Sequence, residues 1–297
     1  MKGEACALAS ALVWSVGVIL FKRSEEVSPQ GINLFKNLFG LLLFIPTLLL
    51  LGLSVDWDRA SADWWALAIS GALGIGIADT MIFMALRRLG ASLLAIADCS
   101  YAPTMVLLAI FWLNEPYSVY LFLGGALVVG GVYLAVAEKT PGALPPRNDL
   151  IIGGLLGMTG IVAMGIGVML VKPIVERADA SIIEVTLVRL SFGVLTQVAW
   201  IALVPSQRSA LKVFSARSVW PTLIPASILG VYVAMMLWLG SFKWANASVA
   251  SVLHQISSVF TVILAWLILK EPMTRRRALG TALAVGGAIL VVLTAPD

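Results

Sequence analysis

Residues 113–131 read LNEPYSVYLFLGGALVVGG, and residues 269–287 read LKEPMTRRRALGTALAVGG. When the comparison is extended to 91–131 and 247–287, no gap is needed and 15 of 41 positions are identical. Apolar composition alone raises the number of matches, but it does not explain a shared Glu-Pro pair followed by glycines at the same distances. The chain is therefore built from two copies of one unit.

The composition indicates that these units lie in a membrane and not in water. Of the 297 residues, 60% are hydrophobic and 12% are charged, and the mean hydropathy is +0.98. A soluble domain carries about 25% charged residues, so a cytosolic enzyme, a secreted disulfide scaffold and a disordered chain are excluded. The net charge of +4 does not indicate nucleic acid binding, because lysines and arginines of membrane proteins mostly mark loops. Cys6 and Cys99 lie in separate apolar runs and offer no disulfide framework or metal cluster, and no cofactor is expected.

Apolar runs long enough to cross a bilayer, about 20 residues each, follow one another along the whole chain. The longest polar connection is EKTPGALPPRND at 138–149, and it separates predicted five-helix units at 1–139 and 149–297. The sequence thus predicts an all-α integral membrane protein with ten transmembrane helices. We place them at 4–22, 29–52, 64–86, 92–113, 117–137, 149–172, 182–204, 220–240, 246–269 and 276–294.

An odd number of spans in each unit reverses the direction in which the second unit crosses the membrane. The starts of the units agree at an offset of 150, since GVILFK at 17–22 resembles GVMLVK at 167–172. The units are therefore predicted to be inverted repeats around a central cavity, an arrangement typical of secondary transporters that bind substrate between their halves. A duplicated membrane scaffold without transport activity is the alternative.

These motifs resemble those of the EamA family of the drug/metabolite transporter superfamily. Four features carry the resemblance. These are two units of five spans each, the Glu-Pro pairs at 115–116 and 271–272, the Gly-x5-Gly-Gly pattern after each pair, and a basic residue early in the second span of each half. The resemblance covers nearly the whole chain. It implies a helical bundle around a central cavity, export or exchange of small metabolites that are often amino acids, no ATP use and no metal. We expect a multi-pass protein of the cell (inner) membrane.

The clearest polar stripe lies in the second span. Asn33, Lys36 and Asn37 share one face of that helix, because their spacing matches the helical period. Arg189 is the counterpart of Lys36 in the seventh span. A cation in a cavity can hold a carboxylate or phosphate of a substrate. We therefore predict that Lys36 and Arg189 are the leading substrate-binding residues, with Asn33 and Asn37 beside Lys36.

Acidic side chains inside the spans offer these cations a second role. A charged group in a span costs about 2.5–3.5 kcal/mol on the insertion scale, so an ion pair would stabilise Asp79, Asp98 or Glu184 together with Lys36 or Arg189. Such a pair holds helices together, and a substrate anion can displace its carboxylate during transport. We also predict that Asp79, with Asp98 and His254, is a secondary residue of the substrate site. Glu184 also lies close to the predicted start of its span, where an interfacial position is the alternative.

Asp98 and His254 occupy equivalent positions of the two repeats. Tyr101 lies one turn after Asp98, and His254 is the only histidine, in a polar run with Gln255. Both Asp98 and His254 can bind and release a proton, so we predict that either can carry a coupled proton as well as contact substrate. The alternative, which we favour for His254, is a packed and hydrogen-bonded network between helices.

Aromatic and methionine side chains offer a surface for an apolar part of the substrate. The candidates are Trp14 and Ser15 in the first span, Tyr101 in the fourth, and Tyr232, Met235 and Trp238 in the eighth. Trp14 and Tyr101 are the two that we assign to the substrate site.

Glu115 and Glu271 precede prolines at helix junctions. A carboxylate next to the start of a helix can satisfy its free N–H groups and its dipole. We therefore interpret both residues as structural, each acting on the helix that follows it.

Other classes of function fit the sequence less well. A membrane metalloprotease needs a His-Glu-x-x-His type of cluster, which one histidine cannot supply, and there is no Walker A motif for an ATP-driven pump. A channel is usually an oligomer with a ring of repeated groups, whereas a pseudo-symmetric chain with one cavity, as a monomer or homodimer, fits alternating access. The expected partners are a small-molecule metabolite such as an amino acid, a coupled proton and the lipid bilayer.

The distribution of basic residues disagrees with the family resemblance on orientation. The predicted loops on the side of the termini carry five lysines and arginines, and those on the other side carry thirteen. The positive-inside rule then places both termini outside, whereas the resemblance implies cytoplasmic termini. We take the charge bias as the prediction.

Overall fold

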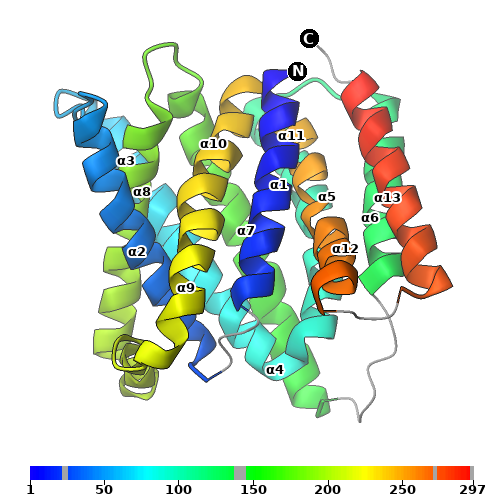
Figure 1. Cartoon of the computed structure of the whole chain (residues 1–297). Coiled ribbons are helices and arrows are strands. Elements are labelled where there is room, and N and C mark those ends of the chain that lie inside the picture. The colour runs from blue at the N-terminus through cyan, green and yellow to red at the C-terminus, as the bar shows by residue number, and fades with distance from the viewer. Residues whose placement is uncertain (22–25, 137–144, 270–272, 295–297) are drawn as a thin grey trace.

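Figure 1 shows the computed structural model of the chain. It describes residues 1–21, 26–136, 145–269 and 273–294, and the regular structure in these ranges is helical. The first half contains α1 (Lys2–Phe21), α2 (Pro29–Leu50), α3 (Ser61–Gly71), the π-helical η1 (Ala72–Ile77), α4 (Ala78–Asp98), α5 (Tyr101–Leu113) and α6 (Val119–Val136). The second half contains α7 (Arg147–Val175), α8 (Ile182–Leu203), the 3-10 helices η2 (Pro205–Phe214) and η3 (Arg217–Val219), α9 (Trp220–Ser227), the π-helical η4 (Ile228–Val233), α10 (Ala234–Trp244), α11 (Ala247–His254), α12 (Ser257–Leu269) and α13 (Arg275–Thr294).

Within the described ranges, nine helical stretches are long and apolar enough to cross a membrane, and α5 is a shorter apolar helix. Two of the expected spans contain a turn that the sequence did not indicate. The span expected at 92–113 is divided between α4 and α5 by a turn at Cys99–Ser100, and the span expected at 246–269 is divided between α11 and α12 by a turn at Gln255–Ile256. Such interruptions are tolerated where the backbone borders a cavity instead of lipid. Most of the predicted linker at 138–149 lies outside the described residues.

The two halves carry their irregular segments at equivalent places. The π-helical segments η1 and η4 begin 156 residues apart, and the turns at Cys99–Ser100 and Gln255–Ile256 are also 156 residues apart. The same offset aligns the two Glu-Pro stretches of the sequence. The duplicated sequence therefore produces the same helix distortions twice.

Glycines bring the first helix of each half close to the π-helical segment of the other half. A Cβ added to Gly17 of α1 would lie 3.1 Å from the Cα of Gly230 in η4. A Cβ added to Gly167 of α7 would lie 3.1 Å from the Cα of Gly74 in η1. Small residues permit such close approach, which favours helix packing in lipid. The two close helix contacts are equivalent, because each joins the first helix of one half to the π-helical segment of the other.

Gly71→Ala is expected to destabilise the protein, because α3 approaches the backbone of α8 at this point. A Cβ at Gly71 would lie 2.1 Å from the carbonyl oxygen of Arg189, which cannot move without shifting α8. Overpacking of this kind costs about 1–3 kcal/mol. The thermal midpoint of the detergent-purified protein measures the effect. Gly130→Ala is the matched control, since nothing lies within 4 Å of its added Cβ, and an equal drop in both variants would contradict the explanation.

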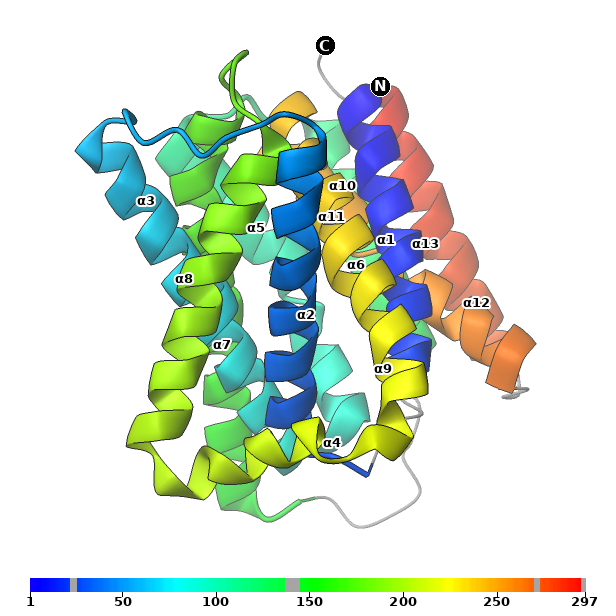
Figure 2. The same ribbon diagram turned by 60° about the vertical axis from the view of Figure 1, so that its left-hand side comes forward.

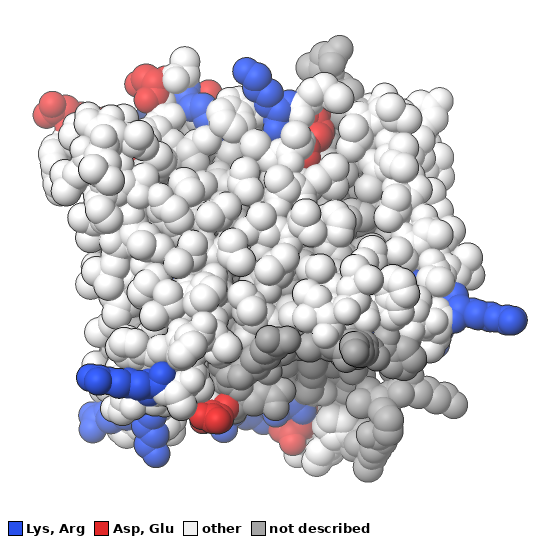
Figure 3. All heavy atoms as spheres, viewed as in Figure 1, with Lys and Arg blue, Asp and Glu red and all other residues white. Residues whose placement is uncertain are grey.

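The helices run between two charged faces. α1 begins and α13 ends on one face, here called the termini face (Figure 1). Figure 3 shows the charged side chains mainly at the two ends of the molecule, with an almost uncharged band between them. On the face opposite the termini, η2 runs across the end of α2 and carries Arg208 and Lys212 (Figure 2). The uncharged band suits the hydrocarbon core of a bilayer.

Candidate functional site: the central cavity

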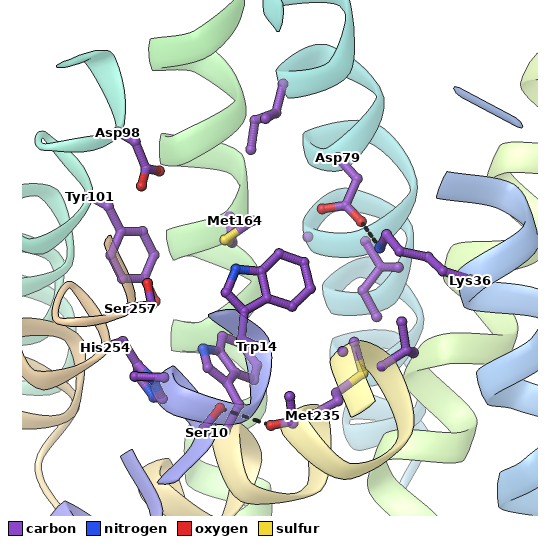
Figure 4. Close-up of a pocket in the computed structure, with 18 of the residues that line it drawn as sticks. Ser10, Trp14, Lys36, Asp79, Asp98, Tyr101, Met164, Met235, His254 and Ser257 are labelled. Atoms are coloured by element: carbon purple, nitrogen blue, oxygen red, sulfur yellow. Dashed lines mark hydrogen bonds and ion pairs between the residues drawn. The ribbon is translucent and has the colours of Figure 1, made fainter. Parts of the chain in front are cut away.

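A cavity of about 350 Å³ lies among helices of both halves (Figure 4). This volume is in the range of small-molecule sites. The walls combine α1, α2, η1, α4 and α5 with α7, α8, η4, α10, α11 and α12, so neither half forms the cavity alone. The polar and charged lining residues are Ser10, Lys36, Asp79, Asp98, Tyr101, Arg189, His254, Gln255 and Ser257.

Lys36 enters the cavity from α2 and is held by neighbours on one side. Its Nζ donates to Asp79 Oδ2 at 3.1 Å and to Asn37 Oδ1 at 3.1 Å. Asn37 Nδ2 donates in turn to Asn33 Oδ1 at 3.2 Å. Asn33 and Asn37 are buried and are not part of the described lining. Asn37 accepts a hydrogen bond from Lys36, and Asn33 accepts one from Asn37, so both hold Lys36 in place without facing the cavity. The carboxylate that pairs with Lys36 is thus Asp79, one of the alternatives left open by the sequence.

Arg189 reaches the cavity from α8. Its Nε donates to Ser70 Oγ at 2.9 Å, and its guanidinium carbon lies 5.5 Å from the centre of the Trp238 ring, a cation–π distance. The residue is only 2% exposed, and its Nη1 has no hydrogen-bond partner among the described residues. An unsatisfied buried donor beside a cavity is suited to an anionic ligand, because guanidinium groups bind carboxylates through paired hydrogen bonds.

Asp98 and Tyr101 lie on a different wall from Lys36 and Asp79. Asp98 is the last residue of α4, and Tyr101 is the first of α5, so both flank the turn that interrupts the predicted span. Figure 4 shows them side by side, with their side chains separated from the Lys36–Asp79 pair by the cavity. Asp98 is exposed there. The cavity therefore presents a second carboxylate on the side away from Lys36.

His254 is packed into a small network at the end of α11. Its Nε2 lies 2.9 Å from Ser241 Oγ, and its ring centre lies 6.2 Å from that of Trp238 and 5.7 Å from that of Phe242. The structure therefore contains the hydrogen-bonded arrangement that we favour for this residue. His254 also forms part of the cavity wall.

The aromatic candidates divide into two groups. Trp14, Met235 and Trp238 line the cavity, as does Tyr101. Ser15 and Tyr232 do not form part of the described lining. Ser15 Oγ donates to the Ser257 carbonyl oxygen at 2.7 Å, and the Tyr232 hydroxyl lies 2.6 Å from Thr47 Oγ1.

Several lining residues were not apparent from sequence reasoning, namely Met164 among the apolar ones and the glycines Gly74 and Gly230. The two glycines carry a signal that sequence inspection could use, because they are 156 residues apart. Met164 carries none, since apolar residues are common in every span.

Glu184 lies in the first turn of α8, near the termini face, but it is not solvated there. It is 3% exposed, and its Oε2 accepts a hydrogen bond from Arg59 Nη2 at 2.6 Å. Arg59 also lies 6.0 Å from the centre of the Trp64 ring. The partner of Glu184 is therefore a loop arginine outside the cavity, and neither Lys36 nor Arg189.

The interpretation of Glu115 as a cap is correct, but the predicted helix is wrong. Its carboxylate accepts hydrogen bonds from the N–H groups of Ala247 and Ser248 at the start of α11, in the other half of the chain. The reason is tertiary packing, because α5 and α11 lie against each other and bring Glu115 to that helix end. Glu271 lies outside the described residues.

The chain matches the model of the EamA-like transporter family over residues 1–137 and 151–293. It is 23% identical over 312 residues to the uncharacterized transporter sll1164 of Synechocystis sp., a match that covers 95% of this chain and 86% of that protein. It is 28% identical over 128 residues to the uncharacterized transporter YetK of Bacillus subtilis, covering 42% of this chain and 39% of YetK. A solved crystal structure shares the fold, with a TM-score of 0.83 at 18% identity over 99% of this chain and 97% of that one. Because the family match spans both halves, the chain belongs to the EamA-like transporter family and is a multi-pass membrane protein.

Proposed function

We propose that the chain is a secondary active transporter that exports or exchanges small metabolites such as amino acids across the cell (inner) membrane. The observation that carries this proposal is the cavity between the halves, which sets Lys36 and Arg189 among aromatic side chains. Membership in a transporter family supports it. In this proposal the protein is a carrier, and it catalyses no chemical reaction.

The lining favours a substrate with a carboxylate, an amine and an apolar part. Arg189 Nη1 is buried without a hydrogen-bond partner among the described residues, so a substrate carboxylate that reaches this wall would satisfy it. Asp98 is exposed on another wall and can accept a hydrogen bond from an ammonium group. Trp14 and Trp238 offer apolar faces between these groups. An amino acid with an apolar side chain meets all these conditions.

The architecture that we propose is a pair of inverted five-helix repeats, with ten crossings of the membrane. The equal spacing of η1 and η4, and of the two turns, supports the duplication. The end of α4 together with α5, and α11 together with α12, each count as one crossing. The bias in basic loop residues supports termini outside the cell. A C-terminal fluorescent reporter that folds only in the cytoplasm tests this orientation and should stay dark.

The proposed function is tested by ligand binding and by flux. An amino acid at about 100 times its Kd stabilises the state that it binds by about 2.7 kcal/mol, so a thermal-shift screen of the detergent-purified chain should find ligands that raise the thermal midpoint. Reconstituted into liposomes, the chain should carry the same ligand with saturable kinetics and exchange it against ligand inside. A coupled proton would make this flux depend on an imposed pH gradient.

The alternatives predict different outcomes. A channel would show flux that rises linearly with concentration and no counter-transport. A scaffold without transport would show neither ligand-dependent stabilisation nor flux above that of empty liposomes. Either result would contradict the carrier.

A further inference from the structure

A buried ion cluster ties the helices together at the termini face. The Glu115 carboxylate accepts hydrogen bonds from the backbone N–H groups of Ala247 and Ser248 at 2.6 and 3.0 Å, and from the Ser248 hydroxyl at 2.7 Å. Lys172 Nζ lies 3.7 Å from Glu115 Oε1 and donates to two carbonyl oxygens around the end of α10, at 3.1 and 3.0 Å. The side chains of Glu115 and Lys172 are only 6% and 3% exposed. The substrate site does not include them.

The cluster joins the two halves of the chain. Glu115 follows α5 through Asn114, whose left-handed backbone (φ 54°) turns the chain at the end of that helix. The carboxylate then holds the start of α11, while Lys172 comes from α7 and reaches the end of α10. Removing either charge would therefore loosen several helix ends at once.

Packed side chains separate this cluster from the cavity. Ala109 of α5 and Ala250 of α11 are fully buried in one apolar group that continues to Tyr101 at the cavity wall. On the opposite face, α4 and α12 continue the paths of α5 and α11, yet within the described residues they make no comparable contact. The packed α5–α11 pair thus lies between the cavity wall and the cluster at the termini face.

The bonds of the cluster can be exchanged without unfolding a helix. The first N–H groups of a helix have no partner within it, so water can replace Glu115 when α5 and α11 separate. A buried charge that loses its partners is strongly destabilising, so the Glu115 carboxylate needs water in place of Ala247, Ser248 and Lys172 when α5 and α11 separate, whereas Lys172 keeps its bonds to Glu176 and the carbonyl oxygens. We propose that Glu115 and Lys172 form a latch that closes the cavity toward the termini face and that is released during transport. This inference rests on the proposed transport function.

Thiol accessibility tests the latch without requiring transport. The parent protein for the test carries Cys6→Ser, Cys99→Ser and Ala250→Cys in the full chain. Vesicles present the termini face to a membrane-impermeant maleimide, and the labelling rate at position 250 is measured. Glu115→Gln weakens charge-assisted hydrogen bonds, so we expect that it raises this rate about tenfold or more. The labelling rate from the opposite face should not rise.

Glu176→Gln is the matched control. Glu176 also accepts a hydrogen bond from Lys172 Nζ, at 2.5 Å, but its side chain is 47% exposed. It contacts neither α5 nor α11 through that bond, so labelling at position 250 should stay at the parent rate. Ser248→Ala removes only the hydroxyl donor to Glu115 and should raise labelling less than Glu115→Gln does. If Glu115→Gln does not fold, the labelling rate of Ser248→Ala alone tests the latch.

Failure of the latch and failure of the transport function give different results. Parent-level labelling in both Glu115→Gln and Ser248→Ala, together with a lower thermal midpoint, would overturn the latch and leave Glu115 as a stabilising cap. Absence of saturable flux from the unmodified protein would overturn the proposed function instead. Raised labelling in both variants, with the smaller rise in Ser248→Ala, supports the latch.

Discussion

Lys36→Ala is expected to lower transport in proteoliposomes by about hundredfold or more, the effect of losing one member of a desolvated charge pair. The variant should still insert and purify as a folded protein, because Asp79 is 19% exposed and cavity water can solvate the carboxylate that is left behind. The measurement is initial flux at a ligand concentration well below half-saturation of the unmodified protein, normalised to the amount of reconstituted protein. Wild-type flux in this variant would remove Lys36 from the site.

The double variant Lys36→Ala/Asp79→Asn separates a binding role from a structural one. If Lys36 only pairs with Asp79 to hold α2 and α4 together, neutralising both should restore packing and flux, because the unpaired charge is gone. If Lys36 binds the substrate, the thermal midpoint should recover while flux stays low. Asp79→Asn alone supplies the control in which the cation remains. We expect the second outcome.

Lys36 illustrates what the sequence could predict. Helical spacing places it on one face with Asn33 and Asn37, and the duplication pairs it with Arg189, so its importance follows from periodicity and repetition. The structure places both cations at one cavity. Ionisable residues are rare in spans and almost always face the bundle interior. The few ionisable residues found inside the spans are therefore good candidates for a cavity wall.

The partners of these charges could not be predicted in the same way. Asp79 was one of several carboxylates available to Lys36, and Glu115 binds the start of α11 from the other half of the chain. Both contacts join segments far apart in sequence, so they depend on how helices pack. Local rules of capping favour the nearest helix and therefore gave the wrong partner for Glu115.

The helix interruptions were hidden for a different reason. The turns at Cys99–Ser100 and Gln255–Ile256 contain neither proline nor glycine. The few polar residues beside them do not end the long apolar runs in which they lie, so average hydropathy over a whole span does not reveal the turns. Only the comparison of the two halves carries a trace, since Asp98 and His254 align there as polar residues. A polar pair at equivalent positions of a repeat can thus mark a break in the helix as well as a proton carrier.

Arg189→Lys is expected to raise the ligand concentration for half-maximal flux by roughly tenfold or more, although the positive charge is kept. The guanidinium donates to Ser70 through Nε while Nη1 stays free for a ligand, and its planar group lies by the Trp238 ring. A lysine ammonium cannot occupy these positions at once, because its donors radiate from one atom. Maximal flux should change less than the half-saturating concentration, since the loss concerns binding.

Arg59→Lys is the matched control for this substitution. Arg59 is also a buried arginine that donates to a side-chain oxygen and lies near a tryptophan ring, but its partners Glu184 and Trp64 are outside the cavity. The general consequences of exchanging a buried arginine for lysine, including a lower thermal midpoint, should therefore appear in both variants. The rise in half-saturating concentration should appear only at Arg189. Equal rises in both would mean that the loss of affinity comes from weakened helix packing, and Arg189 would then be a structural cation.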